Sequence, residues 1–261
     1  MGRQILIGEL HGILLDEIKI IHKIFVENNV PYYMLGGTML GAIRHKGFIP
    51  WDDDMDIGIP RAYFVEAINL LKKELPPCYK VRSINDCNAI TTELIKVENV
   101  ETIITEKSKH DLSFELGVNI DIFPLDKAKN NSLTPFSRNR MIQRLGKLNG
   151  MRLHPTTKFS CIISPVIRIL LFFTRRDFIV RIRRKLFPVN GDFIMNYYGA
   201  WGFKECIPAT FFGNPQLYDF EDTQLLGVSN FDGYLSCLYG DYLKLPPENK
   251  RHVHIDNVLY K

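Results

Sequence analysis

The sequence of 261 residues contains no CxxC pair, no internal repeat and no low-complexity linker. Its five cysteines are scattered and odd in number, which argues against a zinc site and a disulfide framework and is typical of a reducing cytosol. The N-terminus lacks the basic start, unbroken apolar stretch and small-residue cleavage site of a signal peptide. We therefore expect a cytoplasmic protein.

A large excess of charge of one sign is also absent. The formal net charge is +4, which gives no argument for a dedicated nucleic-acid binder and is compatible with a small anionic substrate. Hydrophobic residues make up 46% of the chain, enough to bury one large core or two unequal ones.

Helical and strand patterns alternate in the first half. Leu10, Leu14, Ile18, Ile21 and Phe25 repeat at spacings of three and four, which predicts an amphipathic helix. We predict an α/β (α+β) fold with a nucleotidyltransferase-like mixed sheet core in residues 1–130. Residues 131–261 are expected to be mostly helical and to complete the cleft within one continuous unit. Strands are expected at 32–35, 54–59, 79–84, 93–97, 102–105 and 118–123, and shorter helices at 39–44 and 61–75.

Four acidic residues crowd into positions 52–56. If residues 54–59 form a strand, Met55, Ile57 and Ile59 face the core, and Asp54 and Asp56 share the opposite face. Neighbouring carboxylates raise one another's pKa unless a cation lies between them. A hard divalent ion with oxygen ligands, Mg²⁺ or Mn²⁺, resolves that repulsion. The alternative is a solvated acidic turn.

Two further features favour the metal interpretation. Gly36, Gly37 and Thr38 lie between a predicted strand and a predicted helix, where backbone N–H groups can approach a phosphate. Asp121 points away from the core in the strand expected at 118–123. A carboxylate triad beside a phosphate site serves phosphoryl or nucleotidyl transfer. The candidate catalytic and metal-binding residues are Asp54, Asp56 and Asp121.

The segments LGGTMLGAIRHKGFIPWDDDMDIGIPR, IDIFPLD and YGDYLKLPPENKRHVH together resemble the LicD family. These are phosphocholine-transferase-like proteins with a nucleotidyltransferase-type fold, related to the fukutin group of ribitol-phosphate transferases. The resemblance implies transfer of a phospho-alcohol, phosphocholine or a polyol phosphate, from a CDP-linked donor with release of CMP. The acceptor would be a hydroxyl of a cell-surface glycan or its lipid-linked precursor. The resemblance also implies Mg²⁺ or Mn²⁺ at the three aspartates.

Further residues are assigned with this resemblance in view. Arg44 is expected to reach a donor phosphate, whereas Lys96 is expected to form an ordinary surface pair with its neighbouring glutamates. Trp51 is expected to be buried beside the strand, and Tyr239 and Tyr242 to serve packing. Asp121 is also a candidate general base on the acceptor hydroxyl. The candidate substrate-binding residues are Gly36, Gly37, Thr38, Arg44, Lys250, Arg251 and His252, of which the last three are equally well explained as a solvated basic tail.

Alternatives remain open for the activity and for the alcohol. One rival is a nucleotidyltransferase that moves NMP from an NTP and releases pyrophosphate, and another is a non-catalytic ligand-binding scaffold. Choline would need an aromatic cage for its quaternary ammonium, whereas a polyol would need hydroxyl partners. The aromatic residues that could supply the cage are Tyr197, Tyr198, Trp201, Phe211 and Phe212.

Residues 159–187 are basic and apolar, with Asp177 as the one acid. The apolar stretch is too short to span a bilayer, which takes about 20 residues. One interpretation is peripheral contact with the inner face of an anionic membrane. The other is an ordinary helix whose arginines are exposed or line the donor pocket. The arginines that recur at heptad spacing are Arg168, Arg175, Arg176, Arg183 and Arg184.

Overall fold

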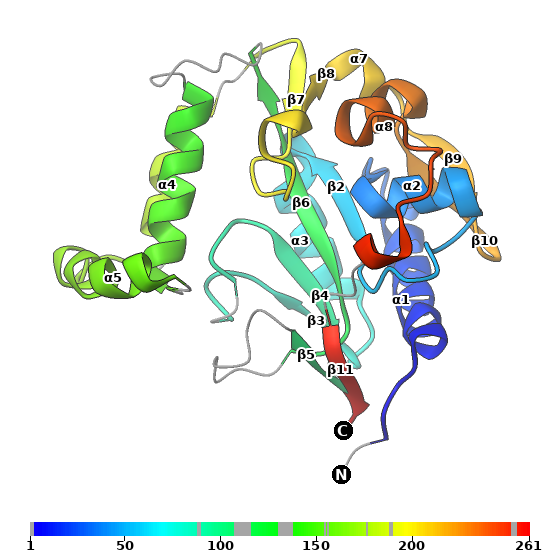
Figure 1. Ribbon diagram of the computed structural model, residues 1–261, viewed down its shortest axis with the longest axis horizontal. Coiled ribbons are helices and arrows are strands. Elements are labelled where there is room, and N and C mark those ends of the chain that lie inside the picture. The colour runs from blue at the N-terminus through cyan, green and yellow to red at the C-terminus, as the bar shows by residue number, and fades with distance from the viewer. Residues whose placement is uncertain are drawn as a thin grey trace.

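The structure is a computed structural model. It describes residues 3–87, 90–106, 116–129, 138–153, 155, 157–175, 177–187, 190–251 and 255–261. The candidate residue His252 and the basic residue Arg176 lie outside these ranges, and the side chain of Lys250 is likewise not described. The predicted fold class is confirmed, because helices pack around a mixed sheet (Figure 1).

The centre of the fold is a sheet of seven strands: β1 (Tyr33–Met34), β2 (Asp56–Pro60), β3 (Tyr79–Arg82), β4 (Ile95–Asn99), β6 (Asn119–Ala128), β7 (Phe193–Met195) and β8 (Cys206–Pro208). The main path runs β1-β2-β6-β4-β3, and β7 pairs with both β6 and β8. Strands β2 and β6 are parallel, and the other neighbouring pairs are antiparallel. Strand β6 therefore lies between two strands that precede it in the sequence.

The helices are α1 (Ile7–Glu27), α2 (Gly36–His45), α3 (Arg61–Glu74), α4 (Arg138–Leu153), α5 (Lys158–Leu170), α6 (Phe178–Leu186), α7 (Ala209–Phe212) and α8 (Phe231–Tyr239). Helix α1 confirms the predicted amphipathic helix, because all five of the residues that define its pattern are buried. Helices α1 and α3 pack on each other and on β6, whereas α2 packs on β2 and α8. The apolar residues of β2 and β6 thus face a core, as their alternation predicts.

Two boundaries differ from the sequence prediction near the acidic stretch. Helix α2 begins at Gly36 rather than at Met39, so the glycines form its first turn and not a preceding turn. Gly36 has a φ of +49°, which an L side chain rarely adopts. Strand β2 begins at Asp56, so Asp54 lies just before the strand. Met55, Ile57 and Ile59 are buried as expected.

After α6 the chain returns to strands that the sequence analysis did not identify. These strands are only three to six residues long, so their local pattern gives little signal. The main hydrophobic core nevertheless includes residues from both halves, such as Ile122 and Leu235. The strands after α6 are β7, β8, β9 (Gln216–Phe220), β10 (Thr223–Gly227) and β11 (Ile255–Tyr260). Strand β9 pairs with β10, and β11 pairs with β5 (Thr102–Glu106).

Two of the arginines of α6 contact other elements of the fold, whereas Arg181 is exposed and pairs with Asp177. Arg183 is only 2% exposed, and its guanidinium lies 4.7 Å from the ring centroid of Tyr198. Arg184 forms an ion pair with Glu93, which also accepts a hydrogen bond of 2.8 Å from the Tyr198 hydroxyl. Arg61 bridges Glu93 to Asp126, with Nε 2.7 Å from Asp126 Oδ1.

Of the heptad arginines that the structure describes, Arg183 alone is buried, so the expectation of exposed arginines fails at Arg183 and holds at Arg168, Arg175 and Arg184. Arg183 is buried where α6 packs on α4, next to Gly146, whereas Arg184 pairs with Glu93 although its side chain is 54% exposed. Arg168 donates hydrogen bonds to the carbonyl oxygens of Arg152 and Leu153. Arg175 is exposed.

Candidate active site

Charged residues form a row across the sheet. Asp56 on β2 lies opposite Asp121 on β6, and Asp121 lies opposite Lys96 on β4. Directly opposed residues of neighbouring strands place their side chains on the same face. The row therefore brings together two of the three predicted aspartates through strand pairing alone.

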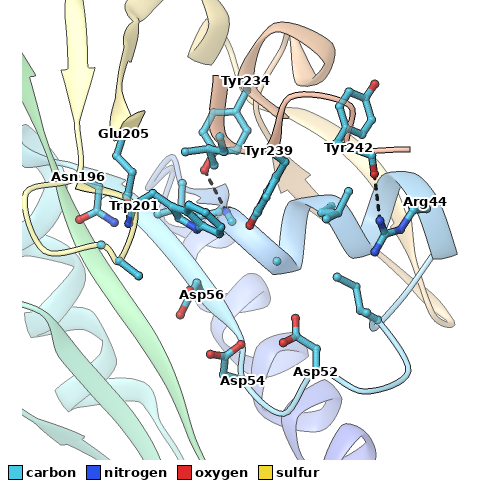
Figure 2. Close-up of a pocket in the computed structure, with 18 of the residues that line it drawn as sticks. Arg44, Asp52, Asp54, Asp56, Asn196, Trp201, Glu205, Tyr234, Tyr239 and Tyr242 are labelled. Carbon is cyan, nitrogen blue, oxygen red and sulfur yellow. Dashed lines mark hydrogen bonds between the residues drawn. The ribbon is translucent and has the colours of Figure 1, made fainter. Parts of the chain in front are cut away.

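A cleft of about 810 Å³ opens over this row. Asp52 and Asp54, just before β2, and Asp56, its first residue, line the cleft (Figure 2). Asp121 lines it from β6. The volume lies within the range of about 300–1,000 Å³ typical of small-molecule sites. All three predicted catalytic aspartates thus line one cavity.

The N-terminus of α2 forms one end of the cleft. Gly36 and Gly37 line it, and Gly36 N donates a hydrogen bond of 3.0 Å to the Tyr234 hydroxyl (Figure 2). Thr38 is buried, and its Oγ1 accepts a hydrogen bond of 2.9 Å from Asp56 N. Thr38 therefore fixes α2 against β2 and positions Asp56, whereas the glycine backbone faces the cavity.

Burial raises the pKa of Asp56 well above its ordinary value, and the neighbouring carboxylates of Asp54 and Asp121 raise it further. The ammonium of Lys96 acts in the opposite direction. Crowded carboxylates of this kind favour a bound cation, which would let them ionise together.

Lys96 contradicts its predicted role as a surface residue. Its side chain is 11% exposed, and Nζ forms an ion pair with Asp121 Oδ1 and donates a hydrogen bond of 2.8 Å to Asn119 Oδ1. The antiparallel pairing of β4 with β6 causes this arrangement by placing Lys96 opposite Asp121. Asp121 therefore has a charged partner on the neighbouring strand.

The donor set has the chemistry of a hard divalent ion, since Asp54, Asp56 and Asp121 supply only carboxylate oxygens. Among the described residues, no three His, Cys, Asp or Glu side chains already stand in a metal-binding arrangement. Asp121 is instead turned to Lys96. For all three aspartates to bind one metal ion, Asp121 would therefore have to leave the Lys96 ammonium and bind the ion instead.

Aromatic side chains cover the opposite side of the cleft. Trp201 and Tyr239 meet edge to face, with ring centroids 5.0 Å apart, and Tyr234 lies beside them (Figure 2). Glu205 lies beside Trp201 and Asn196 and accepts a hydrogen bond of 2.9 Å from Trp201 N. Burial raises the pKa of Glu205 to about 7.

The remaining predicted aromatic residues divide between cleft and core. Tyr198 lines the cleft together with Trp201. Tyr197 is buried and stacks on Phe187, with ring centroids 4.9 Å apart. Phe212 is buried, and Phe211 packs against the hydrophobic core.

Basic residues stand at the far end of the cleft. Arg44 lines it, and its Nη1 donates a hydrogen bond of 3.0 Å to the Tyr242 carbonyl oxygen (Figure 2). Burial lowers the pKa of Arg44, although it remains charged at neutral pH. Trp51 is half-buried rather than fully buried, and the Arg251 guanidinium lies 4.4 Å from its ring centroid. Arg251 thus lies next to a residue that lines the cleft.

Sequence reasoning missed Glu205, Tyr234 and Asn196 as cleft residues and misassigned Lys96. The first three come from segments far from the acidic motif, so no local spacing connects them with it. For Lys96, the available signal was a lysine within a strand pattern, but its partner depends on strand order.

Residues 29–143 match the family model "LicD/FKTN/FKRP, nucleotidyltransferase domain". The chain is 27% identical over 264 aligned residues to the lipopolysaccharide cholinephosphotransferase LicD of Haemophilus influenzae, covering 97% of each protein. It is 31% identical over 157 residues to the uncharacterized protein RP689 of Rickettsia prowazekii, covering 57% of this chain and 56% of that protein. A stretch of 30 residues is 57% identical to human ribitol 5-phosphate transferase FKRP, covering 12% of this chain and 6% of that protein. The predicted resemblance to the LicD family is confirmed.

Proposed function

We propose that this chain, whose residues 29–143 carry a LicD-type nucleotidyltransferase domain, is a phosphotransferase that forms a phosphodiester. In the specific reaction, phosphocholine moves from a CDP-linked donor to a hydroxyl of a glycan or its lipid-linked precursor, and CMP leaves. The observation that carries this proposal is the division of one cleft into an acidic side, at Asp54, Asp56 and Asp121, and an aromatic side.

The acidic side would hold Mg²⁺ or Mn²⁺. The need for a cation follows from charge, because a donor pyrophosphate would otherwise meet several carboxylates. When bound, the ion would neutralise charge that develops on the transferred phosphate. Asp54, Asp56 and Asp121 would supply its oxygen ligands.

The phosphates would lie between the acidic side and the basic end. The Gly37 backbone at the start of α2 offers an N–H group, and the helix N-terminus favours an anion. Arg44 can balance phosphate charge from the same helix. Arg251 lies beside Trp51 and can do so from the C-terminal segment.

The aromatic side suits the head group of choline. Trp201 and Tyr239 present π-surfaces that attract a quaternary ammonium, and Glu205 adds a carboxylate beside them. A polyol would gain less from these rings because it carries no positive charge. This chemistry favours phosphocholine over ribitol phosphate as the transferred group.

Asp121 is the candidate base for the acceptor. It would accept the proton of the glycan hydroxyl as the new P–O bond forms and the bond between phosphorus and the CMP oxygen breaks. Lys96 holds the Asp121 carboxylate and so orients it in the absence of metal. General-base catalysis of this kind contributes about 10²–10⁴-fold to a rate.

A donor screen tests the proposal. Turnover with Mn²⁺ is measured for CDP-choline, CDP-ribitol, CDP-glycerol and CTP, and mass spectrometry identifies CMP or pyrophosphate as the leaving group. We expect CMP, with CDP-choline as the preferred donor. Trp201→Leu should raise KM for CDP-choline but not for CDP-ribitol, whereas Phe211→Leu, outside the cleft lining, serves as the control. Pyrophosphate release from CTP would instead establish a nucleotidyltransferase.

A further inference from the structure

Helix α5 carries its large apolar residues on the outside. Its buried positions are Ser160, Ser164 and Ile167, of which two are small and polar. The side chains on the other side recur at helical spacing and continue into the turn that follows, where Phe173 is 98% exposed. We call this surface the α5 face, and it consists of Phe159, Ile162, Val166, Ile169, Leu170, Phe172 and Phe173.

The α5 face differs from ordinary scattered surface residues because its members are contiguous. Ile162 and Ile169 are each 75% exposed and lie two helical turns apart on one side of α5. Helices α4 and α5 project to one side of the sheet, away from the cleft residues at α2 and α8 (Figure 1). Contiguous exposed apolar surfaces of this kind mark sites of contact with a protein or a membrane.

Exposed cations flank the α5 face in the sequence, at the start of α5 and in the chain that follows it, and we call them the basic rim. Arg175 and Arg181 have side chains that are 69% and 60% exposed, and Lys158 and Lys185 are also exposed. Asp177, which pairs with both arginines, is the one acidic residue between positions 158 and 187. The rim of the α5 face is therefore net positive.

We propose that the α5 face inserts into the interface of an anionic lipid membrane while the basic rim contacts lipid head groups. A helix with an apolar side and a basic border lies in the plane of such an interface. Spanning is excluded for the described helices, none of which is both long and apolar enough to cross a bilayer. A second copy of the chain fits less well because pairing two α5 faces would bring two positive rims together. The inference does not depend on the transferred group or on metal.

Vesicle sedimentation with the full chain tests this inference. The probes are vesicles of phosphatidylglycerol and phosphatidylethanolamine, compared with vesicles of phosphatidylcholine alone. We expect binding to the anionic vesicles, weakened by added salt. The variant Ile162→Ser/Ile169→Ser/Phe173→Ser should lower the partition coefficient at least tenfold. Its matched control is Val26→Ser/Val65→Ser/Leu217→Ser, which removes exposed apolar residues from other surfaces and should bind as the wild type does.

The rim is tested by Arg175→Gln/Arg181→Gln/Lys185→Gln, with Lys23→Gln/Lys72→Gln/Lys73→Gln as the charge-matched control. Only the rim variant should lose selectivity for anionic vesicles. Insertion is read directly from Phe173→Trp, whose added fluorescence should shift to the blue with anionic vesicles.

Three results would overturn the inference. The first is absence of vesicle binding by the wild type, and the second is equal binding by the α5-face variant. The third is a wild-type dimer that the α5-face variant converts to monomer without any vesicle binding, which would assign the face to a second copy.

Discussion

Replacing Lys96 with Met is the sharpest test of how the site accommodates charge. The change keeps an unbranched apolar chain but removes the ammonium that contacts Asp121 and Asn119. Asp121 would then stand beside Asp54 and Asp56 without its cation. We expect the metal-free variant to be less stable than the wild type and to gain more stability from Mn²⁺.

The magnitude follows from burial. Removing one partner of a fully buried ion pair costs about 3–5 kcal/mol. The Asp121 side chain is 23% exposed, so water replaces part of the lost interaction and we expect a cost of about 2 kcal/mol. For a chain of this size, such a loss lowers Tm by about 4–8 °C. Metal at 100 times its Kd stabilises by about 2.7 kcal/mol, enough to offset the loss.

The assay is denaturant unfolding of both proteins with and without Mn²⁺. The matched control is Arg82→Met, which breaks the ion pair with Glu98 on the neighbouring strands β3 and β4 but leaves Asp121 paired with Lys96. This control should lose stability without any extra gain from Mn²⁺. Equal stabilisation of wild type and Lys96→Met by Mn²⁺ would refute the reasoning that the ammonium occupies the place of a metal ion.

Four further substitutions test the site and its support. Asp56→Asn should abolish metal-dependent turnover while apo Tm holds or rises, since a repelling carboxylate is removed; a turnover assay and a melting curve decide this. Asp121→Asn should remain about 10²–10⁴-fold slow at saturating Mn²⁺ if Asp121 is the base, and recovery to wild-type turnover would leave it a ligand only. Glu205 has a folded-state pKa raised to about 7, so its stabilising effect is present below its unfolded pKa and is lost as pH rises through 7. Wild type should therefore lose up to about 3 kcal/mol relative to Glu205→Gln between pH 5 and 8 in denaturant titrations, and pH-independent differences would contradict this. Arg61→Met should cost about 3–5 kcal/mol by leaving Glu93 and Asp126 buried without Arg61, and an unchanged unfolding midpoint would contradict that estimate.

Local sequence patterns predicted the acidic side of the site because strand alternation and motif spacing are local properties. The burial of Ile57 and Ile59 follows from alternation, as does the shared face of Asp56 and Asp121 once both strands join the sheet. The role of Lys96 could not be predicted this way, because Glu93 and Glu98, which lie near it in the sequence, suggested a different pairing. Its partner depends on β4 lying next to β6.

The aromatic side was less accessible to prediction for a related reason. Trp201 and Tyr198 were recognised as candidates and line the cleft. Tyr197 and Phe212 were candidates for the same reason, their aromatic side chains, but they lie in the core. Aromatic residues carry the same local signal in both places, so only tertiary packing separates them. Glu205 gave no signal at all, since a single glutamate outside any motif is usually exposed.

The position of β6 in the sheet also constrains how the protein folds. Strands β2, β3 and β4 are synthesised before β6. Strands β2 and β4 join the same sheet only through β6, which lies between them. Asp56 and Asp121 therefore meet only when this late, non-local strand docks, a step that is intrinsically slow. A nascent or partly unfolded chain that has formed only the β3–β4 hairpin holds its carboxylates apart, so assembly of the acidic site is coupled to completion of the sheet.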